Sequence, residues 1–197
     1  MKPNRIFSGI ILFVVASSAY AGLIPVSEVT ASSTFYSYST DNLVSGSGLS
    51  GNTHDGNWEN KWLANETVTG TLVFNFGSIF DISSSSIWNY GGGCCGTTRS
   101  VKDLGIEASL DGITYSSIGS FILNQSTDPL ILADTIFLDT TAQYIKFNLN
   151  SNYGANYTGL SEVQFNGVAA SVSEPTSIAL LTLGLAGIGF SRKKNAN

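Results

Sequence analysis

Side chains suited to ligand recognition gather in one glycine-rich segment, residues 87–112. Arg99 carries a planar guanidinium, whose paired N–H donors suit the vicinal hydroxyls of a sugar or a carboxylate. Asn89 can both donate and accept hydrogen bonds, and the ring of Tyr90 can stack on a sugar face. Because loops held between strands often carry function, we predict that this segment binds a ligand.

Each of these residues also has a structural interpretation. Arg99 can form a salt bridge, with Asp103 or Asp55 as partner, and the sequence leaves this role as open as ligand binding. One of Asn89 and Tyr90 can equally belong to the core. The sequence therefore predicts where a binding site lies, but not which of these side chains contact the ligand.

Catalysis has little support in the sequence. His54 is the only histidine, which excludes a cluster of histidine metal ligands, and no serine stands in the glycine-flanked turn that a Ser-His-Asp triad needs. No spacing of acids nominates the carboxylate pair of a glycosidase. We predict a protein that is not an enzyme, with His54 in a loop hydrogen bond that is structural or faces a ligand.

Cys94 and Cys95 are adjacent in the same glycine-rich segment. Neighbouring cysteines can close only a small, strained disulfide ring. The flanking glycines could absorb that strain, so a vicinal disulfide is our hypothesis, beside an intermolecular bridge or two free thiols.

The elements that must position these residues are predicted to be strands. Short stretches rich in Val, Ile, Thr, Phe and Tyr alternate with clusters of Gly, Ser, Asn and Asp, and no apolar helical spacing persists over three turns. Asp111-Gly112 is a hairpin signal, and residues 43–58 read as a long loop. About eight strands favour an all-β sandwich or jelly roll. The predicted strands are residues 26–35, 69–76, 87–90, 104–109, 115–123, 135–138, 142–149 and 160–165.

The N-terminus has the pattern of a secretory signal peptide. Lys2 and Arg5 precede an apolar run, and residues 19–21 (Ala-Tyr-Ala) have the form of a cleavage site. We expect residues 1–21 to be removed after Ala21 by the secretion machinery.

The C-terminus carries a second apolar segment, residues 176–190, followed directly by the basic sequence Ser-Arg-Lys-Lys at 191–194. As a helix it would rise only ~22 Å, short of the ~30 Å hydrocarbon core of a bilayer, so alone it is a marginal membrane span.

Ser173-Glu174-Pro175, the apolar segment and the basic cluster follow one another in the order of a PEP-CTERM sorting tail, which residues 173–194 resemble. The first positions depart from the usual Val-Pro-Glu-Pro. The resemblance implies recognition by an exosortase, transient membrane anchoring, cleavage near Glu174 and Pro175, and delivery to the cell surface or extracellular matrix. A permanent C-terminal anchor is the alternative.

Between these ends we predict one domain at residues 22–167, a linker at 168–172 and a tail at 173–197. Every acidic residue except Glu174 lies in residues 22–172, whereas the basic residues there are only Lys61, Arg99, Lys102 and Lys146. An acidic domain without a basic cluster excludes nucleic acid as a partner and suits neutral ligands or cations.

Six motifs in order resemble a discoidin domain, the coagulation-factor C-type module with a galactose-binding-like jelly roll. They cover nearly all of residues 26–167. The resemblance implies a module that binds carbohydrate or polysaccharide through loops at one end of the barrel, without transforming it. A structural adhesion or biofilm-matrix protein on the same fold is the alternative. The motifs are residues 29–32 (Val-Thr-Ala-Ser), 72–77 (Leu-Val-Phe-Asn-Phe-Gly), 87–90 (Ile-Trp-Asn-Tyr), 106–112 (Ile-Glu-Ala-Ser-Leu-Asp-Gly), 144–147 (Tyr-Ile-Lys-Phe) and 160–167 (Leu-Ser-Glu-Val-Gln-Phe-Asn-Gly).

The discoidin resemblance also implies roles for single residues. An arginine at the place of Arg99 often contacts ligand in sugar-binding relatives. The loop with Asn152 and Tyr153 commonly adds an aromatic platform, although turn chemistry explains the pair almost as well.

Many discoidin relatives hold one structural calcium ion near the last strand. Glu162 matches their acidic ligand, but Ser45 stands where an acid is common, so Asp41 or Asp55 would have to serve beside loop carbonyls.

Overall fold

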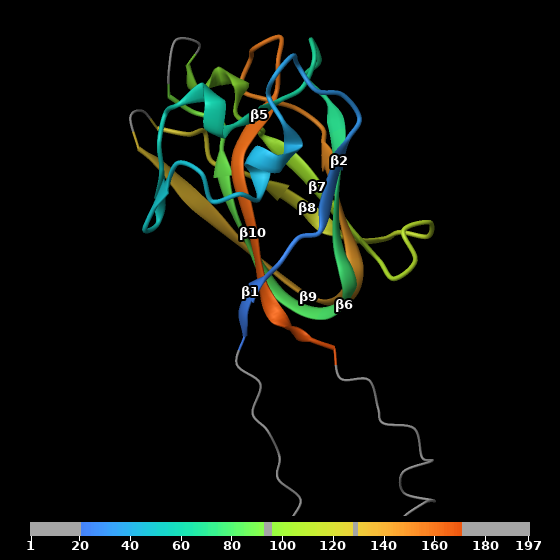
Figure 1. The fold of residues 1–197 in the computed structure, drawn as a ribbon. Helices are drawn as coiled ribbons and strands as arrows, with labels where there is room; N and C mark the ends of the chain where they lie inside the picture. The colour runs from blue at the N-terminus through green and yellow to red at the C-terminus, as the bar shows by residue number, and fades with distance from the viewer. Residues whose placement is uncertain (1–20, 93–95, 128–129, 171–197) are drawn as a thin grey trace, which may run out of the picture.

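The computed structural model describes residues 21–92, 96–127 and 130–170, and in these ranges the chain is all-β (Figure 1). None of the helices in the described ranges has the length and hydropathy needed to cross a membrane. Three 3-10 turns stand between the strands: η1 (Thr40–Leu43), η2 (Trp58–Asn60) and η3 (Thr97–Arg99). The strands are β1 (Gly22–Ile24), β2 (Glu28–Ala31), β3 (Leu49–Ser50), β4 (Thr53–His54), β5 (Trp62–Leu63), β6 (Gly70–Asn89), β7 (Asp103–Ser109), β8 (Ser116–Ile122), β9 (Ile131–Leu149) and β10 (Gly159–Ala169).

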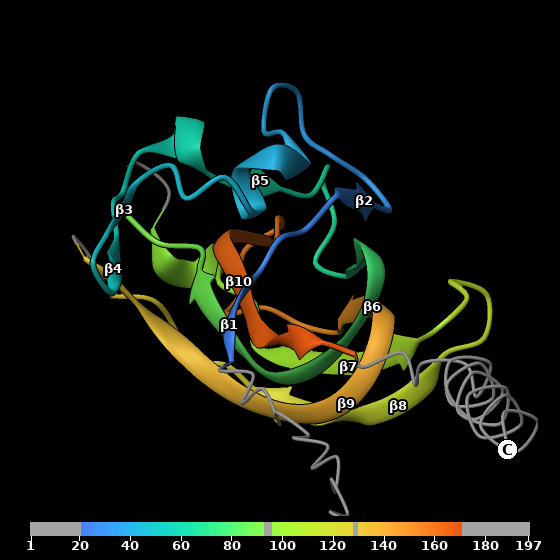
Figure 2. The ribbon, with the colours of Figure 1, turned by 60° about the horizontal axis from the view of Figure 1, so that its bottom comes forward.

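Two long strands, β6 and β9, take part in both layers of a sandwich. In the first layer, residues 70–75 of β6 pair with β2 on one side and with residues 144–149 of β9 on the other. These residues of β9 also pair with β7, and β7 pairs with β8. Beyond its bend, β6 pairs with β10 and with the first part of β9, and β1 and β4 extend this second layer. All these pairings are antiparallel, and Figure 2 shows β6 and β9 curving round one end of the sandwich.

The bends merge strands that the sequence analysis separated. Predicted strands 69–76 and 87–90 are both in β6, and 135–138 and 142–149 are both in β9. Gly77 and Asp139 have φ of 76° and 43°, and the β6–β9 register shifts between Asn75 and Phe80. A left-handed residue and a register shift turn a strand without ending it, which period-2 patterning does not reveal.

Two further predictions need correction. The first strand, expected over residues 26–35, is only Glu28–Ala31. The expected loop 43–58 contains the β3–β4 hairpin, which adds to the edge of β9. Both changes follow from pairing partners far away in sequence.

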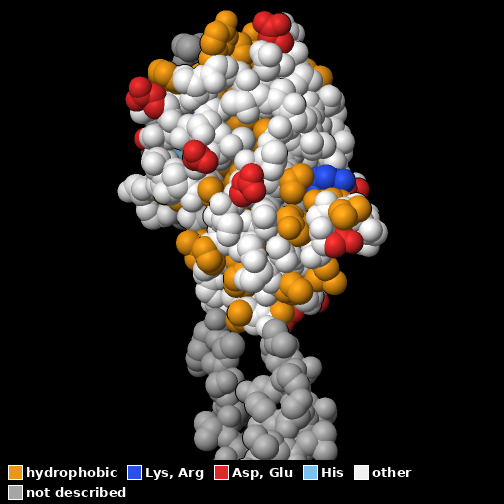
Figure 3. Space-filling model, turned by 45° about the vertical axis from the view of Figure 1, so that its right-hand side comes forward, with side chains coloured by type: hydrophobic (Ala, Val, Ile, Leu, Met, Phe, Trp, Pro, Cys, Tyr) orange, Lys and Arg blue, Asp and Glu red, His pale blue; other side chains and the backbone are white. Residues whose placement is uncertain are grey.

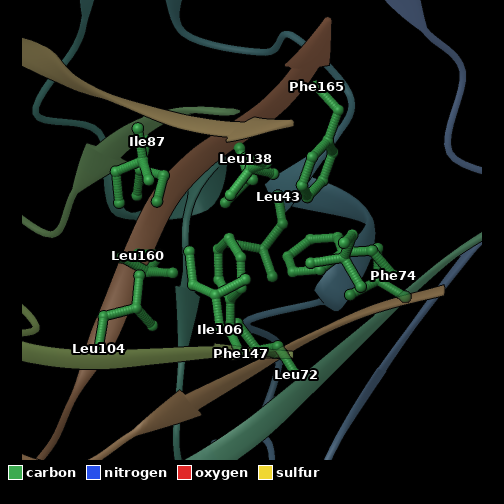
Figure 4. Close-up of a cluster of buried hydrophobic side chains, with 14 of the residues drawn as sticks. Leu43, Leu72, Phe74, Ile87, Leu104, Ile106, Leu138, Phe147, Leu160 and Phe165 are labelled. Carbon is green, nitrogen blue, oxygen red and sulfur yellow. The ribbon is translucent and has the colours of Figure 1, made fainter. Parts of the chain in front are cut away.

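Aromatic rings and aliphatic side chains fill the space between the layers (Figure 4). Phe74 of β6 lies 5.0 Å from Phe147 of β9 and 5.1 Å from Phe165 of β10, ring centroid to centroid, with tilted or edge-on planes. All three are fully buried. Burying a phenylalanine contributes about 1.5–3 kcal/mol, so these rings are a main source of the sandwich's stability.

The two ends of the sandwich differ. The chain enters through β1 and leaves through β10 at one end, and β6 and β9 bend there (Figure 1). The opposite end, which we call the loop end, collects η2, η3 and the loops that follow β2 and β9 (Figure 1).

Candidate functional site

Aromatic rings from three separate loops meet at the loop end. The ring of Phe35 lies 4.5 Å from Tyr36, 6.1 Å from Tyr38 and 5.2 Å from Tyr157, and Tyr38 lies 5.5 Å from Trp58. We call these five residues the aromatic loop cluster. Tyr36 is 88% and Trp58 50% exposed, so the cluster presents aromatic surface to solvent.

Arg99 in η3 stands against this cluster. Its guanidinium carbon lies 5.1 Å from the ring centroid of Tyr157 and 5.8 Å from that of Tyr90. Its Nη1 donates a long hydrogen bond of 3.4 Å to the Tyr90 hydroxyl. The structure thus brings two predicted site residues, Tyr90 and Arg99, together.

Tyr90 is buried, which distinguishes it from the exposed rings. Burial raises its pKa to about 12, against the smaller opposing effect of the hydrogen bond from Arg99. Its hydroxyl therefore stays protonated over the physiological pH range. The buried ammonium of Lys61 lies 5.0 Å from the same ring centroid and donates to the carbonyl of Gly91. The buried Tyr90 thus contacts the guanidinium of Arg99 on the side of the protein interior.

Asn89 is 1% exposed and lies at the end of β6. Its Nδ2 donates to the carbonyls of Val101 (2.7 Å) and Asn124 (3.0 Å), and its Oδ1 accepts from the amides of Val101 (2.8 Å) and Tyr90 (3.0 Å). These four bonds use the full capacity of the amide. The predicted ligand contact does not fit this geometry: Asn89 holds the site's loops together from inside.

His54 on β4 is also fully buried. Its Nδ1 lies 2.9 Å from the carbonyl of Asp55, so Nδ1 carries the hydrogen. Burial lowers its pKa, outweighing the carbonyl and carboxylate of Asp55, and the ring is neutral near pH 7. A Cβ on Gly48 would come within 2.8 Å of the His54 ring. His54 is a loop support, one of its two predicted roles.

In the loop before β10, hydrogen bonds hold both predicted residues, Asn152 and Tyr153, and a third residue, Tyr157, lies beside Arg99. Asn152 donates to the carbonyls of Ala155 and Tyr157 and accepts from Gly154, which fixes the turn. The Tyr153 hydroxyl donates to the carbonyl of Leu123 at 2.7 Å. Tyr157, not Tyr153, is the ring beside Arg99.

The sequence analysis missed Tyr38, Trp58, Lys61 and Tyr157. Their contacts join residues far apart in the chain, so spacing along the sequence carries no signal for them. The nearest available sign was a run of aromatic residues at 35–38.

The predicted calcium site has only part of its ligands in one place. A cavity of about 150 Å³ is lined by Ser45 and Glu162 among others, but not by Asp41 or Asp55. The Asp55 carboxylate instead accepts hydrogen bonds from the Asn57 amide and the Asn60 side chain. Among the described residues, no group of three or more His, Cys, Asp or Glu side chains could hold a metal ion.

Glu162 itself faces a donor. The backbone N–H of Gly46 points at both carboxylate oxygens, at 3.1 and 3.2 Å. Burial raises the pKa of Glu162 to about 7, although the bond from Gly46 works against the rise. One N–H uses only part of the carboxylate's lone pairs, and the loop carbonyls predicted as further ligands are not part of this contact, so calcium binding at Glu162 stays a prediction.

The remaining predicted positions lie at or beyond the edges of the described ranges. Ala21 is exposed just before β1. Cys94, Cys95, Glu174 and Pro175 lie outside the described residues, so the disulfide hypothesis and the cleavage site stay predictions.

Residues 28–163 match the family model of the F5/8 type C domain, which is more than half of the chain. The chain belongs to this family. No curated protein matches it. The F5/8 type C fold agrees with the predicted discoidin-like sandwich.

Solved structures with the same fold include sugar complexes. The family 32 CBM from Clostridium perfringens NanJ, in complex with galactose, is 17% identical, with 75% of this chain and 99% of that chain covered and a TM-score of 0.58. The CBM32 of AlyQ in complex with 4,5-unsaturated mannuronic acid is 19% identical (73% and 97% covered, TM-score 0.53). The lectin domain of lectinolysin complexed with Lewis B antigen is 14% identical (73% and 93% covered, TM-score 0.54).

The tail matches a second family model. Residues 171–193 match the PEP-CTERM protein-sorting motif. This confirms the predicted resemblance and marks an exported protein that an exosortase sorts.

Proposed function

We propose that this F5/8 type C domain is a non-catalytic carbohydrate-binding module whose site is the aromatic loop cluster with Arg99. One observation carries the proposal: a guanidinium stands 5.1 Å from the ring of Tyr157, on a surface with the exposed ring of Trp58. The solved relatives, described as CBMs and a lectin domain with bound sugars, support it.

The chemistry of the cluster suits a sugar. A pyranose presents C–H groups on its faces, which pack on aromatic rings, and hydroxyls on its rim, which pair with a planar donor such as Arg99. The positive charge of Arg99 also suits a sugar carboxylate. Beneath it, Asn89 accepts a buried hydrogen bond from the Val101 amide just after η3, and the Tyr90 hydroxyl accepts one from Arg99. These bonds hold Arg99 in place, which lowers the ordering cost of binding.

Catalysis is not part of the proposal. The described carboxyl group with a raised pKa is Glu162, and its cavity is lined by residues 23–26, 44–46 and 162–164, none of which belongs to the aromatic loop cluster. The described carboxyl groups thus give no support for a catalytic acid and base beside Arg99.

The proposed location follows from the sorting motif. The secretion machinery exports the chain, the C-terminal segment anchors it briefly in the membrane, and an exosortase releases it to the cell surface or extracellular matrix. β10 ends at the end of the sandwich opposite the loop end, so the cluster lies away from the last described residues (Figure 1). An extracellular polysaccharide or glycan can therefore reach it.

The test is glycan-array binding of the purified full-length protein and of three variants. Arg99→Ala should weaken binding roughly 10- to 100-fold, as expected for a charged hydrogen-bond donor, and Arg99→Lys should restore little because the fork is lost. Lys102→Ala is the matched control, because it removes an exposed cation three positions away.

Binding that survives Arg99→Ala unchanged would refute the proposed site. An array on which the wild-type protein binds no glycan would favour the structural matrix role instead.

A further inference from the structure

A second concave surface lies on the sandwich, away from the loops. It is a groove of about 490 Å³ across the outer face of β6, β9, β7 and β8. One row of cross-strand partners forms its floor: Thr71 pairs with Asn148, Asn148 with Gly105, and Gly105 with Ser120. Four strands at ~4.8 Å spacing make this row roughly 14 Å long. We call it the sheet-face groove.

Gly105 creates the hollow at the centre of the row. A Cβ at this position would meet Asn148 Cβ and Asn150 Nδ2 at 3.5 Å, which is ordinary contact distance. Neither packing nor backbone geometry therefore requires glycine there. Glycine weakens a strand and often marks a close approach by a ligand, so its presence in β7 needs another reason.

The lining of the groove is polar without net charge. Thr71, Ser117, Ser120, Asn148 and Asn150 offer hydroxyls and amides, which both donate and accept hydrogen bonds. The one charged side chain, Glu107, is ion-paired with Lys146. Such a surface complements the hydroxyls of a neutral sugar and provides no counter-charge for an anionic polymer.

A protein partner fits this groove less well. Protein interfaces have an apolar or aromatic core, whereas the side chains that line this row are small and hydrophilic. Figure 3 shows how sparsely charge is placed on one face of the molecule, with single acidic groups standing apart. Uncharged hydrogen-bonding groups in a row suit an extended chain of repeating polyols.

We propose that the sheet-face groove binds a neutral polysaccharide chain, as a second site separate from the aromatic loop cluster. The groove lies on regular strands of one layer, and the cluster lies on the loops at the end of the sandwich. The inference does not depend on the function proposed for the cluster.

The experiment is affinity electrophoresis of the full-length protein in native gels that contain galactomannan, xylan or soluble β-glucan, with alginate as the anionic comparison. At least one neutral polymer should retard the protein. Gly105→Val should weaken that retardation roughly tenfold or more, because a branched side chain fills the hollow, and Gly105→Ala should have a smaller effect. Valine favours a strand, so the melting temperature should not fall.

Two further variants separate the sites. Arg99→Ala should keep the retardation by neutral polymer while losing binding on the glycan array. Asn148→Ala with Asn150→Ala removes the amides without adding bulk and should act like Gly105→Val, even if valine disturbs folding.

Three results would overturn the proposal. They are retardation that persists in both groove variants, retardation that Arg99→Ala alone abolishes, and retardation by alginate but by none of the neutral polymers.

Discussion

The body of the sandwich and its loop end are held together by different forces. The body depends on apolar burial, with Phe74, Phe147 and Phe165 in contact across the layers. The loop end depends on buried polar groups, with Asn89 joining β6 to two loops through three hydrogen bonds. The hydrophobic effect does not depend on the orientation of the groups in contact, whereas a hydrogen bond weakens when its angle departs from linear. The body therefore sets stability, and the loop end sets the position of the binding groups.

The largest expected effect tests the body. Phe74→Ala should lower the free energy of unfolding by about 3–5 kcal/mol, because it removes a buried ring and leaves a cavity. Chemical denaturation measures it. Phe137→Ala is the matched control, since Phe137 is 81% exposed. The folded fraction of Phe74→Ala should still bind sugar. An equal decrease in the free energy of unfolding in Phe74→Ala and Phe137→Ala would show that the buried rings do not stabilise the body of the sandwich.

The next effect tests the loop end. Asn89→Ala should cost about 1–3 kcal/mol, because buried backbone groups lose their partners, and should also weaken sugar binding. Denaturation and array binding, measured on the same preparation, give both numbers. Asn166→Ala on the outer face of β10 is the control. If Asn89→Ala is destabilised but binds sugar as tightly as the wild-type protein, the loop end does not set the position of the binding groups.

The smallest effect concerns two buried titratable groups outside the apolar core. Glu162 has a raised pKa of about 7, so the folded chain holds this proton more tightly and the free energy of unfolding falls as pH rises from about 4.5 to 7. His54 has a lowered pKa, so stability falls as pH drops below 6.5. The two slopes oppose each other. Glu162→Gln should leave only the loss on acidification, seen by denaturation between pH 4.5 and 7.5.

Controls for this titration separate it from metal binding. Glu28→Gln, at an exposed position on β2, should keep the wild-type profile. Calcium and a chelator test the predicted calcium site, because a cation would compete with the Gly46 N–H for the Glu162 carboxylate. A calcium-dependent rise in melting temperature that Glu162→Gln removes would support the calcium site, and an unchanged melting temperature would contradict it.

Much of the fold could be predicted because alternation of apolar residues directly encodes which face of a strand is buried. Leu72, Phe74 and Phe76 alternate with polar or smaller residues along the predicted strand 69–76, which puts them on one face, and all three are buried. Arg99 could be named because a cation in a glycine-rich loop is conspicuous. Tyr157 could not be separated from Tyr153, since both stand in one polar loop. The structure ties the Tyr153 hydroxyl to Leu123 and leaves the Tyr157 ring beside Arg99.

The sequence by itself determined the all-β class, the sorting tail and the sparse positive charge, because each depends on composition or on local order along the chain. Only the tertiary structure decided that Asn89 is a buried anchor, that Gly46 faces Glu162, and that a row of polar side chains flanks Gly105. These facts depend on pairing between distant segments, and local spacing does not encode which strand lies beside which.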